Sequence, residues 1–211
     1  MKTFITDAIE DYAHAHTRAE PDQLIRLMEK THATMDYPQM LTGRVEGRFL
    51  KLLVQIFQPR LILEVGMFTG YSALSMAEGL ADDGKIITCD IDPKARDMAQ
   101  TAFDASPVGH KIEIKMGPAL NTIRQLKQTI DFAFIDADKK AYPVYYEEIL
   151  TRTRSGGVIV MDNMFLSGKV LDPQDDAAKA VAKLNQDIAH DDRVENVLLT
   201  IRDGVQLIRK K

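Results

Sequence analysis

The spacing of hydrophobic residues along the chain changes near residue 58. Before this point, apolar residues recur at helical spacing, which predicts three amphipathic helices. The first includes Phe4 and Ile9, the second follows Pro21, and the third ends before Pro59, because the residue before a proline rarely stays helical. The N-terminal part of the chain is therefore predicted to contain helices only.

From residue 60 onward, short apolar runs alternate with helical stretches. The runs occupy 61–65, 85–90, 112–114, 132–136 and 157–162, and the helical stretches between them include 71–81, 94–105, 119–128 and 141–152. Nearly continuous apolar strands that alternate with helices are typical of a parallel sheet covered on both faces.

The end of the chain follows a different pattern. Two more strands, 193–201 and 205–209, flank Arg202-Asp203-Gly204, which is a turn typical of an antiparallel hairpin. The sequence thus predicts an α/β fold with a doubly wound, Rossmann-like sheet, mostly parallel and completed by a C-terminal antiparallel hairpin. No repeat or Gly/Ser-rich linker divides the chain, so we expect one domain over residues 1–211, with 1–58 as a helical cap and 59–211 as the core.

Composition restricts the partners that the protein can have. The chain has 27 Lys and Arg against 31 Asp and Glu, and a net charge of −4 provides no general attraction for nucleic acid or an anionic membrane. The one cysteine, Cys89, cannot form an intrachain disulfide, and the N-terminal stretch is too acidic for a signal peptide. No apolar run is long enough to span a membrane. We therefore expect a cytoplasmic protein.

Acidic residues lie at or near the ends of four of the five apolar runs, namely Glu64, Asp90, Asp136 and Asp162. Ligands of doubly wound sheets bind beyond the carboxyl ends of the strands. One acidic residue there can simply cap the next helix, but four like charges directed to one rim repel one another. The pattern therefore favours a site that binds cations.

The first strand–helix loop indicates a nucleoside cofactor. Gly66 permits a tight turn and Gly70 a close approach of the backbone to a ligand, but Phe68 stands where a dinucleotide site needs its second glycine. The cofactor would then lack a pyrophosphate; alternatively, the glycines only close the turn. Asp90 is placed to accept hydrogen bonds from both ribose hydroxyls, whereas Asp92, before a proline, is interpreted as a helix N-cap.

Five motifs in this order resemble those of one enzyme family. They are Glu64-Val-Gly-Met-Phe-Thr-Gly-Tyr-Ser72, Asp90-Ile-Asp-Pro, Gly117-Pro-Ala-Leu, Ile135-Asp-Ala-Asp-Lys and Asp162-Asn163. From about residue 35 to the C-terminal Asp203-Gly204, the chain is similar to the class I, cation-dependent S-adenosylmethionine O-methyltransferases of the caffeoyl-CoA and catechol type, in their bacterial form.

The resemblance implies a set of site residues. The cofactor would be contacted by Thr42, Glu64, Gly66, Met67, Ser72, Asp90, Ala119 and Asp138, and the metal ligands would be Asp136, Asp162 and Asn163. Such hard oxygen donors suit Mg²⁺, or else Mn²⁺ or Ca²⁺, and not zinc. Lys139 would be the general base, assisted by Asp136, with its pKa lowered by the cation; the alternative is an ordinary surface lysine.

The activity implied is methyl transfer to a hydroxyl of a small phenolic substrate with neighbouring hydroxyls, in a homodimer. Plant-type relatives usually carry Trp and Asn at the positions of Leu166 and Ser167, and this departure favours free diphenols over a coenzyme A thioester. One alternative is an O-methyltransferase of hydroxyuridine in transfer RNA, for which Arg44, Arg48 and Lys51 could form a basic strip. A second is a binding protein without catalysis.

Several other residues allow a plain structural interpretation. His14 and His16 are interpreted as surface residues and Cys89 as a core residue. Tyr142, Tyr145 and Tyr146 could stack on a substrate ring or pack in the core.

Overall fold

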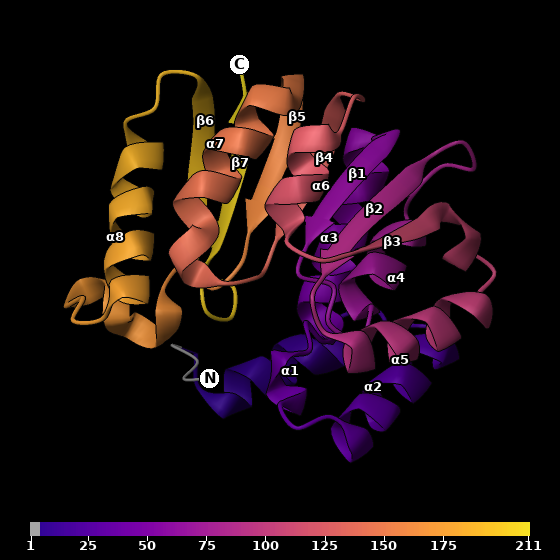
Figure 1. The fold of residues 1–211 in the computed structure, drawn as a ribbon. Helices are drawn as coiled ribbons and strands as arrows, with labels where there is room; N and C mark the ends of the chain where they lie inside the picture. Colours follow the sequence, from indigo (N-terminus) through magenta and orange to yellow (C-terminus); the bar gives the residue numbers. More distant parts are fainter. Residues whose placement is uncertain (1–4) are drawn as a thin grey trace. The chain divides into compact units, whose positions relative to one another are not determined.

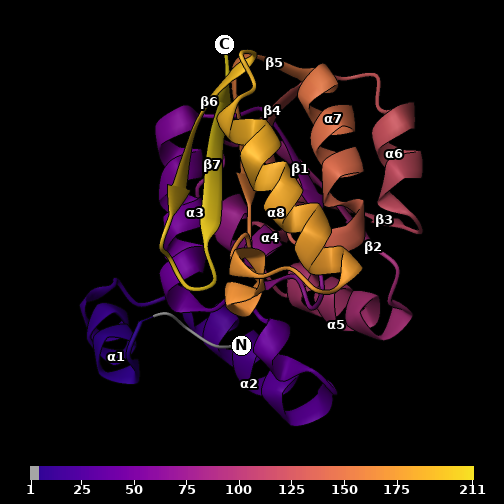
Figure 2. The same cartoon turned by 90° about the vertical axis from the view of Figure 1, so that its left-hand side faces the viewer.

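The chain folds into two compact units. A computed structural model describes residues 5–211, and its units are Asp7–Ala119 and a second one that consists mainly of Leu120–Lys211. Figures 1 and 2 show their helices and strands from two directions. Within the described residues, no helix has both the length and the apolar character that a membrane span requires. Phe4, expected in the first helix, lies outside the described residues.

The unit Asp7–Ala119 combines helices with three strands. Its helices are α1 (Asp7–His16), α2 (Asp22–Thr34), η1 (Pro38–Met40), α3 (Arg44–Phe57), α4 (Tyr71–Ala77), α5 (Pro93–Asp104) and η2 (Gly109–Lys111). Its strands are β1 (Leu61–Val65), β2 (Lys85–Asp90) and β3 (Ile112–Met116), paired in parallel in the order β3-β2-β1. The predicted helices and strands are confirmed here. Helix α4 ends at Ala77 instead of residue 81, and Gly79 follows, where a Cβ would lie 2.6 Å from the carbonyl oxygen of Lys51.

The second unit contains the predicted hairpin. Its helices are α6 (Ala119–Gln125), η3 (Lys139–Ala141), α7 (Tyr142–Arg152), η4 (Leu166–Leu171) and α8 (Asp176–Ala189), and its strands are β4 (Ile130–Ile135), β5 (Thr153–Met161), β6 (Val194–Leu199) and β7 (Val205–Lys210). The strand order is β4-β5-β7-β6, with β4 and β5 parallel and β7 antiparallel to both of its neighbours. Strand β5 begins before the predicted residue 157, and its register against β4 shifts between Ile130 and Phe132.

Helix α2 belongs to the hydrophobic core of the first unit. Its Leu24 and Leu27 join a buried cluster that includes Met67, Tyr71 and Phe103 of the neighbouring loop and helices. Helix α1 differs, since it buries no side chain. The predicted helical cap is therefore not uniform, because α2 and α3 bury apolar side chains and α1 lies on the surface.

Helices α4 and α5 approach each other closely at Gly70. This residue has a φ of 88°, and a Cβ on it would lie 2.6 Å from the ring of Phe103 and 3.1 Å from Ala99. Gly43 has a similar φ of 79°, but a Cβ there would meet nothing within 4 Å. The two glycines therefore differ in the space around them, and also in backbone conformation, because ψ is 14° at Gly70 and 176° at Gly43.

We expect Gly70→Ala to lower the free energy of unfolding for two reasons. A left-handed conformation costs a non-glycine residue about 1 to 2 kcal/mol, and overpacking against Phe103 and Ala99 should add about 1 to 3 kcal/mol. Urea unfolding measures the loss. A loss no larger than the backbone cost would show that Phe103 and Ala99 can move away without cost.

Candidate functional site

The loop between β1 and α4 is shaped by the carboxylate of Asp90. Its Oδ2 accepts hydrogen bonds from the backbone N–H groups of Met67 (3.0 Å) and Phe68 (2.7 Å), and its Oδ1 accepts from those of Ile91 (2.7 Å) and Asp92 (2.9 Å). These bonds hold Phe68 in a left-handed conformation with a φ of 48°. A carboxylate accepts about four hydrogen bonds, so ribose hydroxyls would have to replace or share some of these donors.

The other predicted cofactor residues of this unit are mostly buried. Glu64 is completely buried and accepts a hydrogen bond from the hydroxyl of Thr88, its partner on β2. Thr42, Ser72 and Ala119 are buried as well. Met67 points into the hydrophobic cluster, so its polar contribution to the site is its backbone N–H. Asp92 caps α5 through the N–H of Lys94, as predicted.

Asp136 and Asp162 lie at the same end of adjacent parallel strands. Ile135 of β4 pairs with Met161 of β5, and each aspartate directly follows one of these residues. Asp162 is 2% exposed; burial, and then the charge of Asp136, raise the pKa of its carboxyl group. Asn163 donates hydrogen bonds to the Asp162 carboxylate through its backbone N–H (2.6 Å) and its side-chain amide (3.1 Å). The backbone of Asn163 is left-handed, with a φ of 57°.

These three residues fit a hard divalent cation. Two carboxylates, one of them buried in a place that disfavours its charge, are stabilised by a cation between them, and an amide oxygen completes a set of oxygen donors. Across the described residues, no three His, Cys, Asp or Glu side chains form a group that could hold a metal ion. The predicted set contains only two such side chains, because its third member is an asparagine.

Lys139 is held inside the second unit. Its Nζ lies 2.8 Å from Oδ1 of Asp136 and 2.5 Å from the hydroxyl of Tyr142, and its side chain is 15% exposed. The alternative of an ordinary surface lysine is therefore wrong. Burial acts to lower the pKa of Lys139, but the Asp136 carboxylate and Tyr142 outweigh it and raise the pKa above its usual value. The lowering expected beside a bound cation stays a prediction.

Tyr142 connects the predicted base with the two strand ends. Its hydroxyl accepts a hydrogen bond from Lys139 and lies within donating distance of the carbonyl oxygens of Ile135 (3.2 Å) and Asp162 (3.1 Å). Tyr142 and Tyr146 are fully or almost fully buried, so the core interpretation holds for both. Asp138 is exposed and caps η3 through the N–H of Lys140 (3.3 Å), a structural role that the sequence did not indicate.

The loop after Asn163 is held by the hairpin turn of the same unit. Leu166 and Ser167 have φ values of 47° and 55°. The buried Asp203 accepts from the N–H of Ser167 through Oδ1 (2.7 Å) and from the N–H of Phe165 through its carbonyl oxygen (2.8 Å). The sequence identified Asp203 only as a turn residue.

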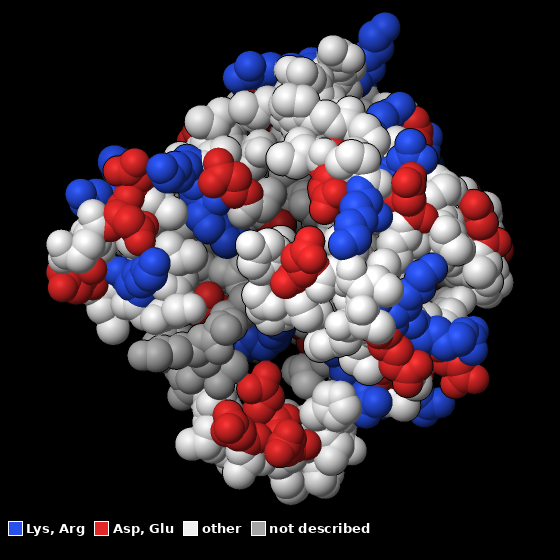
Figure 3. All heavy atoms as spheres, turned by 60° about the horizontal axis from the view of Figure 1, so that its bottom comes forward, with Lys and Arg blue, Asp and Glu red and all other residues white. Residues whose placement is uncertain are grey.

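The three cations proposed as a basic strip are paired with acidic residues. Arg44 forms an ion pair with Glu20, and Arg48 and Lys51 pair with Glu78 at 2.8 and 3.0 Å. On the face drawn in Figure 3, basic and acidic side chains are interspersed. The local feature that favoured RNA as the substrate is therefore not present as a strip of free charges.

Comparison with known proteins identifies close similarity to methyltransferases. A family model described as O-methyltransferase matches residues 14–211. Caffeoyl-CoA O-methyltransferase 5 of Nicotiana tabacum is 35% identical over 205 residues, which cover 90% of this chain and 85% of the tobacco protein. The structure of the Podospora anserina methyltransferase PaMTH1 with bound SAH has a TM-score of 0.90 at 27% identity, over 100% of both chains.

A second solved structure agrees with the first. The O-methyltransferase from Bacillus cereus in complex with SAH has a TM-score of 0.89 at 30% identity and is matched over 97% of both chains. These similarities confirm the predicted α/β, Rossmann-like methyltransferase fold.

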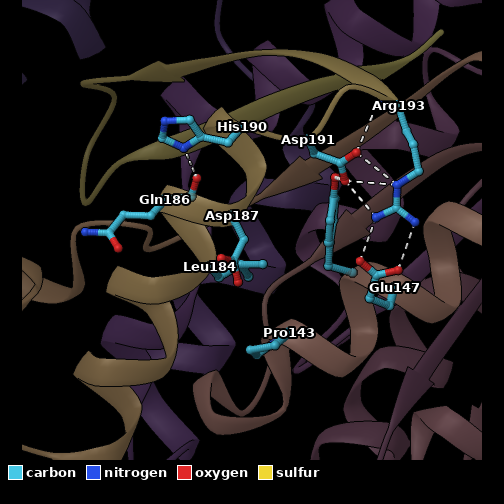
Figure 4. Close-up of a pocket in the computed structure, with 9 residues that line it drawn as sticks. Pro143, Glu147, Leu184, Gln186, Asp187, His190, Asp191 and Arg193 are labelled. Atoms are coloured by element: carbon cyan, nitrogen blue, oxygen red, sulfur yellow. Dashed lines mark hydrogen bonds and ion pairs between the residues drawn. The ribbon is translucent and has the colours of Figure 1, made fainter.

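A hollow of about 700 Å³ lies between α7 and α8 of the second unit (Figure 4). None of the predicted site residues lines it. Its charged groups bind one another: Asp191 accepts from the hydroxyl of Tyr146 (2.8 Å) and from Arg193 (2.7 Å), which also pairs with Glu147 (2.7 Å). This cluster stabilises the fold around the hollow.

We expect Asp191 to stabilise the protein near neutral pH and to lose this effect in acid. The hydrogen bonds from Arg193 hold the pKa of Asp191 well below its usual range. The stabilisation is therefore fully present above the unfolded pKa, about 3.9, and is lost gradually as the pH falls from there through the lower pKa of the folded state. Asp191→Asn should lower the free energy of unfolding by about 1 to 2 kcal/mol at pH 7, and by less near pH 3, where the unfolded chain is already largely protonated at this residue.

Urea unfolding across this pH range is the measurement. Asp187→Asn is the control, because Asp187 lines the same hollow but forms only an exposed pair with Lys183, for which a loss of about 0.5 kcal/mol or less is expected. A loss for Asp191→Asn that does not vary with pH would contradict the electrostatic explanation.

Proposed function

This chain belongs to the O-methyltransferase family, and from that premise we propose that it transfers a methyl group from S-adenosylmethionine to a hydroxyl of a small, catechol-like molecule with the help of a divalent cation. The observation that carries the proposal is the group formed by Asp136, Asp162 and Lys139, with two carboxylates at adjacent strand ends and an amine held beside them. The third residue for the cation is Asn163.

The residues have distinct tasks in this proposal. A divalent cation at Asp136, Asp162 and Asn163 would bind the two hydroxyl oxygens of a diol and stabilise the phenolate charge. When the Asp136 carboxylate is engaged in this way, the negative charge that raises the pKa of Lys139 is offset, and Nζ can accept the proton of a substrate hydroxyl. Mg²⁺ is the expected ion because all three ligands are oxygens.

The methyl donor would be bound by the unit Asp7–Ala119. Glu64 supplies a buried carboxylate for the amino group of the donor, Ser72 a hydroxyl for its carboxylate, and Asp90 acceptors for the ribose. The presence of SAH in the related Podospora anserina and Bacillus cereus proteins supports this part of the proposal.

Two further expectations accompany the proposed activity. Leu166 and Ser167 follow the metal residues where plant-type relatives have larger or amide side chains, which favours a free diphenol as the acceptor. A homodimer is expected because Ile9, Tyr12 and Ile56 expose apolar side chains on α1 and α3, at 59%, 63% and 71%.

Methyl transfer from labelled S-adenosylmethionine to caffeic acid, with Mg²⁺ and with excess EDTA, tests the proposal. We expect turnover with Mg²⁺, its loss with EDTA and its recovery when Mg²⁺ is added back, while SAH binding by calorimetry persists in EDTA. A monohydroxy analogue should not be methylated. Turnover that is indifferent to EDTA would refute the role of the cation, and turnover with neither the diol nor any other small phenol would refute the substrate class.

We expect Tyr142→Phe to slow the chemical step selectively. Without the hydroxyl, Lys139 keeps only Asp136 as a hydrogen-bond partner and loses its fixed position, so kcat should fall about 10- to 100-fold while the Kd of SAH stays unchanged. Steady-state kinetics and calorimetry measure the two effects.

Tyr146→Phe is the matched control for this variant. It removes a buried hydroxyl from the same helix, bonded there to Asp191, and should cost similar stability, about 1 kcal/mol, without a change in kcat. If both variants lose the same activity, Tyr142 has no specific role in positioning Lys139.

A further inference from the structure

The loop that follows β1 is held from the side of the N-terminal helices as well as by Asp90. Thr31 of α2 and Thr69 of the loop are both completely buried, and their hydroxyl oxygens lie 2.9 Å apart. The Thr31 hydroxyl also lies 2.8 Å from the carbonyl oxygen of Leu27, which can only accept. The arrangement that uses every proton therefore has Thr31 bonded to Leu27 and Thr69 donating to Thr31.

Thr69 stands at the point where the loop needs outside support. Phe68 before it and Gly70 after it both have left-handed backbones, with φ values of 48° and 88°. A non-glycine residue in this conformation is strained and persists only where its surroundings fix it. Asp90 fixes the N–H groups before Thr69, and Thr31 fixes the side chain of Thr69 itself.

A second contact reaches the residue on the other side of Gly70. The carboxylate of Glu20, which precedes α2, accepts a hydrogen bond from the hydroxyl of Tyr71 at 3.3 Å and forms an ion pair with Arg44. The side chain of Glu20 is 1% exposed, and that of Tyr71 is equally buried. The two residues that flank Gly70 are thus both bonded to the segment that contains Glu20 and Thr31.

We infer that α2 is a part of the cofactor-binding apparatus, and that Thr31 is a positioning residue that sets the conformation of loop 66–72 through Thr69. The inference rests on the proposed function for the identity of the ligand. Gly66 and Ser72, at the two ends of this loop, are the residues expected to contact S-adenosylmethionine. If the docked α2 selects the binding conformation, cofactor binding must in turn stabilise the docking of α2, because coupling between two sites is reciprocal.

Variants of Thr31 separate positioning from simple packing. Thr31→Val keeps the shape of the side chain and removes the hydroxyl, and Thr31→Ser keeps the hydroxyl. Thr34→Val is the matched control, because Thr34 makes the same type of bond to the carbonyl of Lys30 (2.7 Å) on the exposed side of the same helix. Each variant is studied as the full chain.

The first readout is hydrogen exchange of the amides of residues 66–72 in the protein without cofactor. We expect Thr31→Val to accelerate exchange there, and Thr31→Ser and Thr34→Val to leave it unchanged. The second is the Kd of SAH by calorimetry, which should rise about fivefold for Thr31→Val and less than twofold for the other two. A thermal melt of each free variant establishes that it is folded.

Unchanged loop exchange and unchanged SAH affinity in a folded Thr31→Val variant would overturn the inference. A loss of melting temperature without either change would also do so, because it would reduce Thr31 to a packing residue. If the unaltered protein bound no SAH, the proposed function would fail instead, while the exchange experiment would still decide whether Thr31 holds the loop.

Discussion

Parallel pairing of neighbouring strands places the residues that follow them side by side, and in each unit the predicted site residues depend on this constraint. In the unit Asp7–Ala119, Val65 pairs with Cys89, so Asp90 comes next to the loop that begins at Gly66. In the second unit, Ile135 pairs with Met161, so Asp136 comes next to Asp162. A shift of one residue in either register would turn these side chains to the opposite face of the sheet.

Carboxylates at strand ends are stabilised in two different ways in this protein. Asp90 accepts four backbone N–H groups and so fixes a loop conformation. Asp162 lies buried beside Asp136, and its carboxylate accepts hydrogen bonds from the backbone N–H and the side-chain amide of Asn163. The charge of Asp162 is disfavoured, whereas that of Asp90 is well solvated by the peptide groups. Residues that look alike in the sequence therefore lie in different surroundings, because Asp90 fixes a loop while Asp162 is buried where its charge is disfavoured.

The hydrophobic pattern was sufficient to predict the strands, most helices and the closing hairpin, because burial imposes a period on the sequence. It also predicted which acidic residues share a sheet edge. Helix α8 could have been found as well, from its N-cap at Asp175 and the spacing of Val181, Leu184 and Ile188. Other contacts could not be predicted from the pattern. They are the hydrogen bonds of Asp90 to the loop, of Tyr142 to Lys139 and of Arg48 to Glu78, and each depends on the three-dimensional path of the backbone or on residues far apart in the chain.

The way in which the hairpin turn holds the loop after Asn163 has an evolutionary consequence. The turn binds the loop through the backbone N–H groups of Met164, Phe165 and Ser167. Since any residue except proline offers the same donor, mutations can exchange side chains such as those of Leu166 and Ser167 without loss of these bonds. Phe165 is constrained by its contact with Gly204, where a Cβ would lie 2.7 Å from the ring. A lineage can thus diversify this loop, and with it the surroundings of Asp162 and Asn163, while its fold is inherited unchanged.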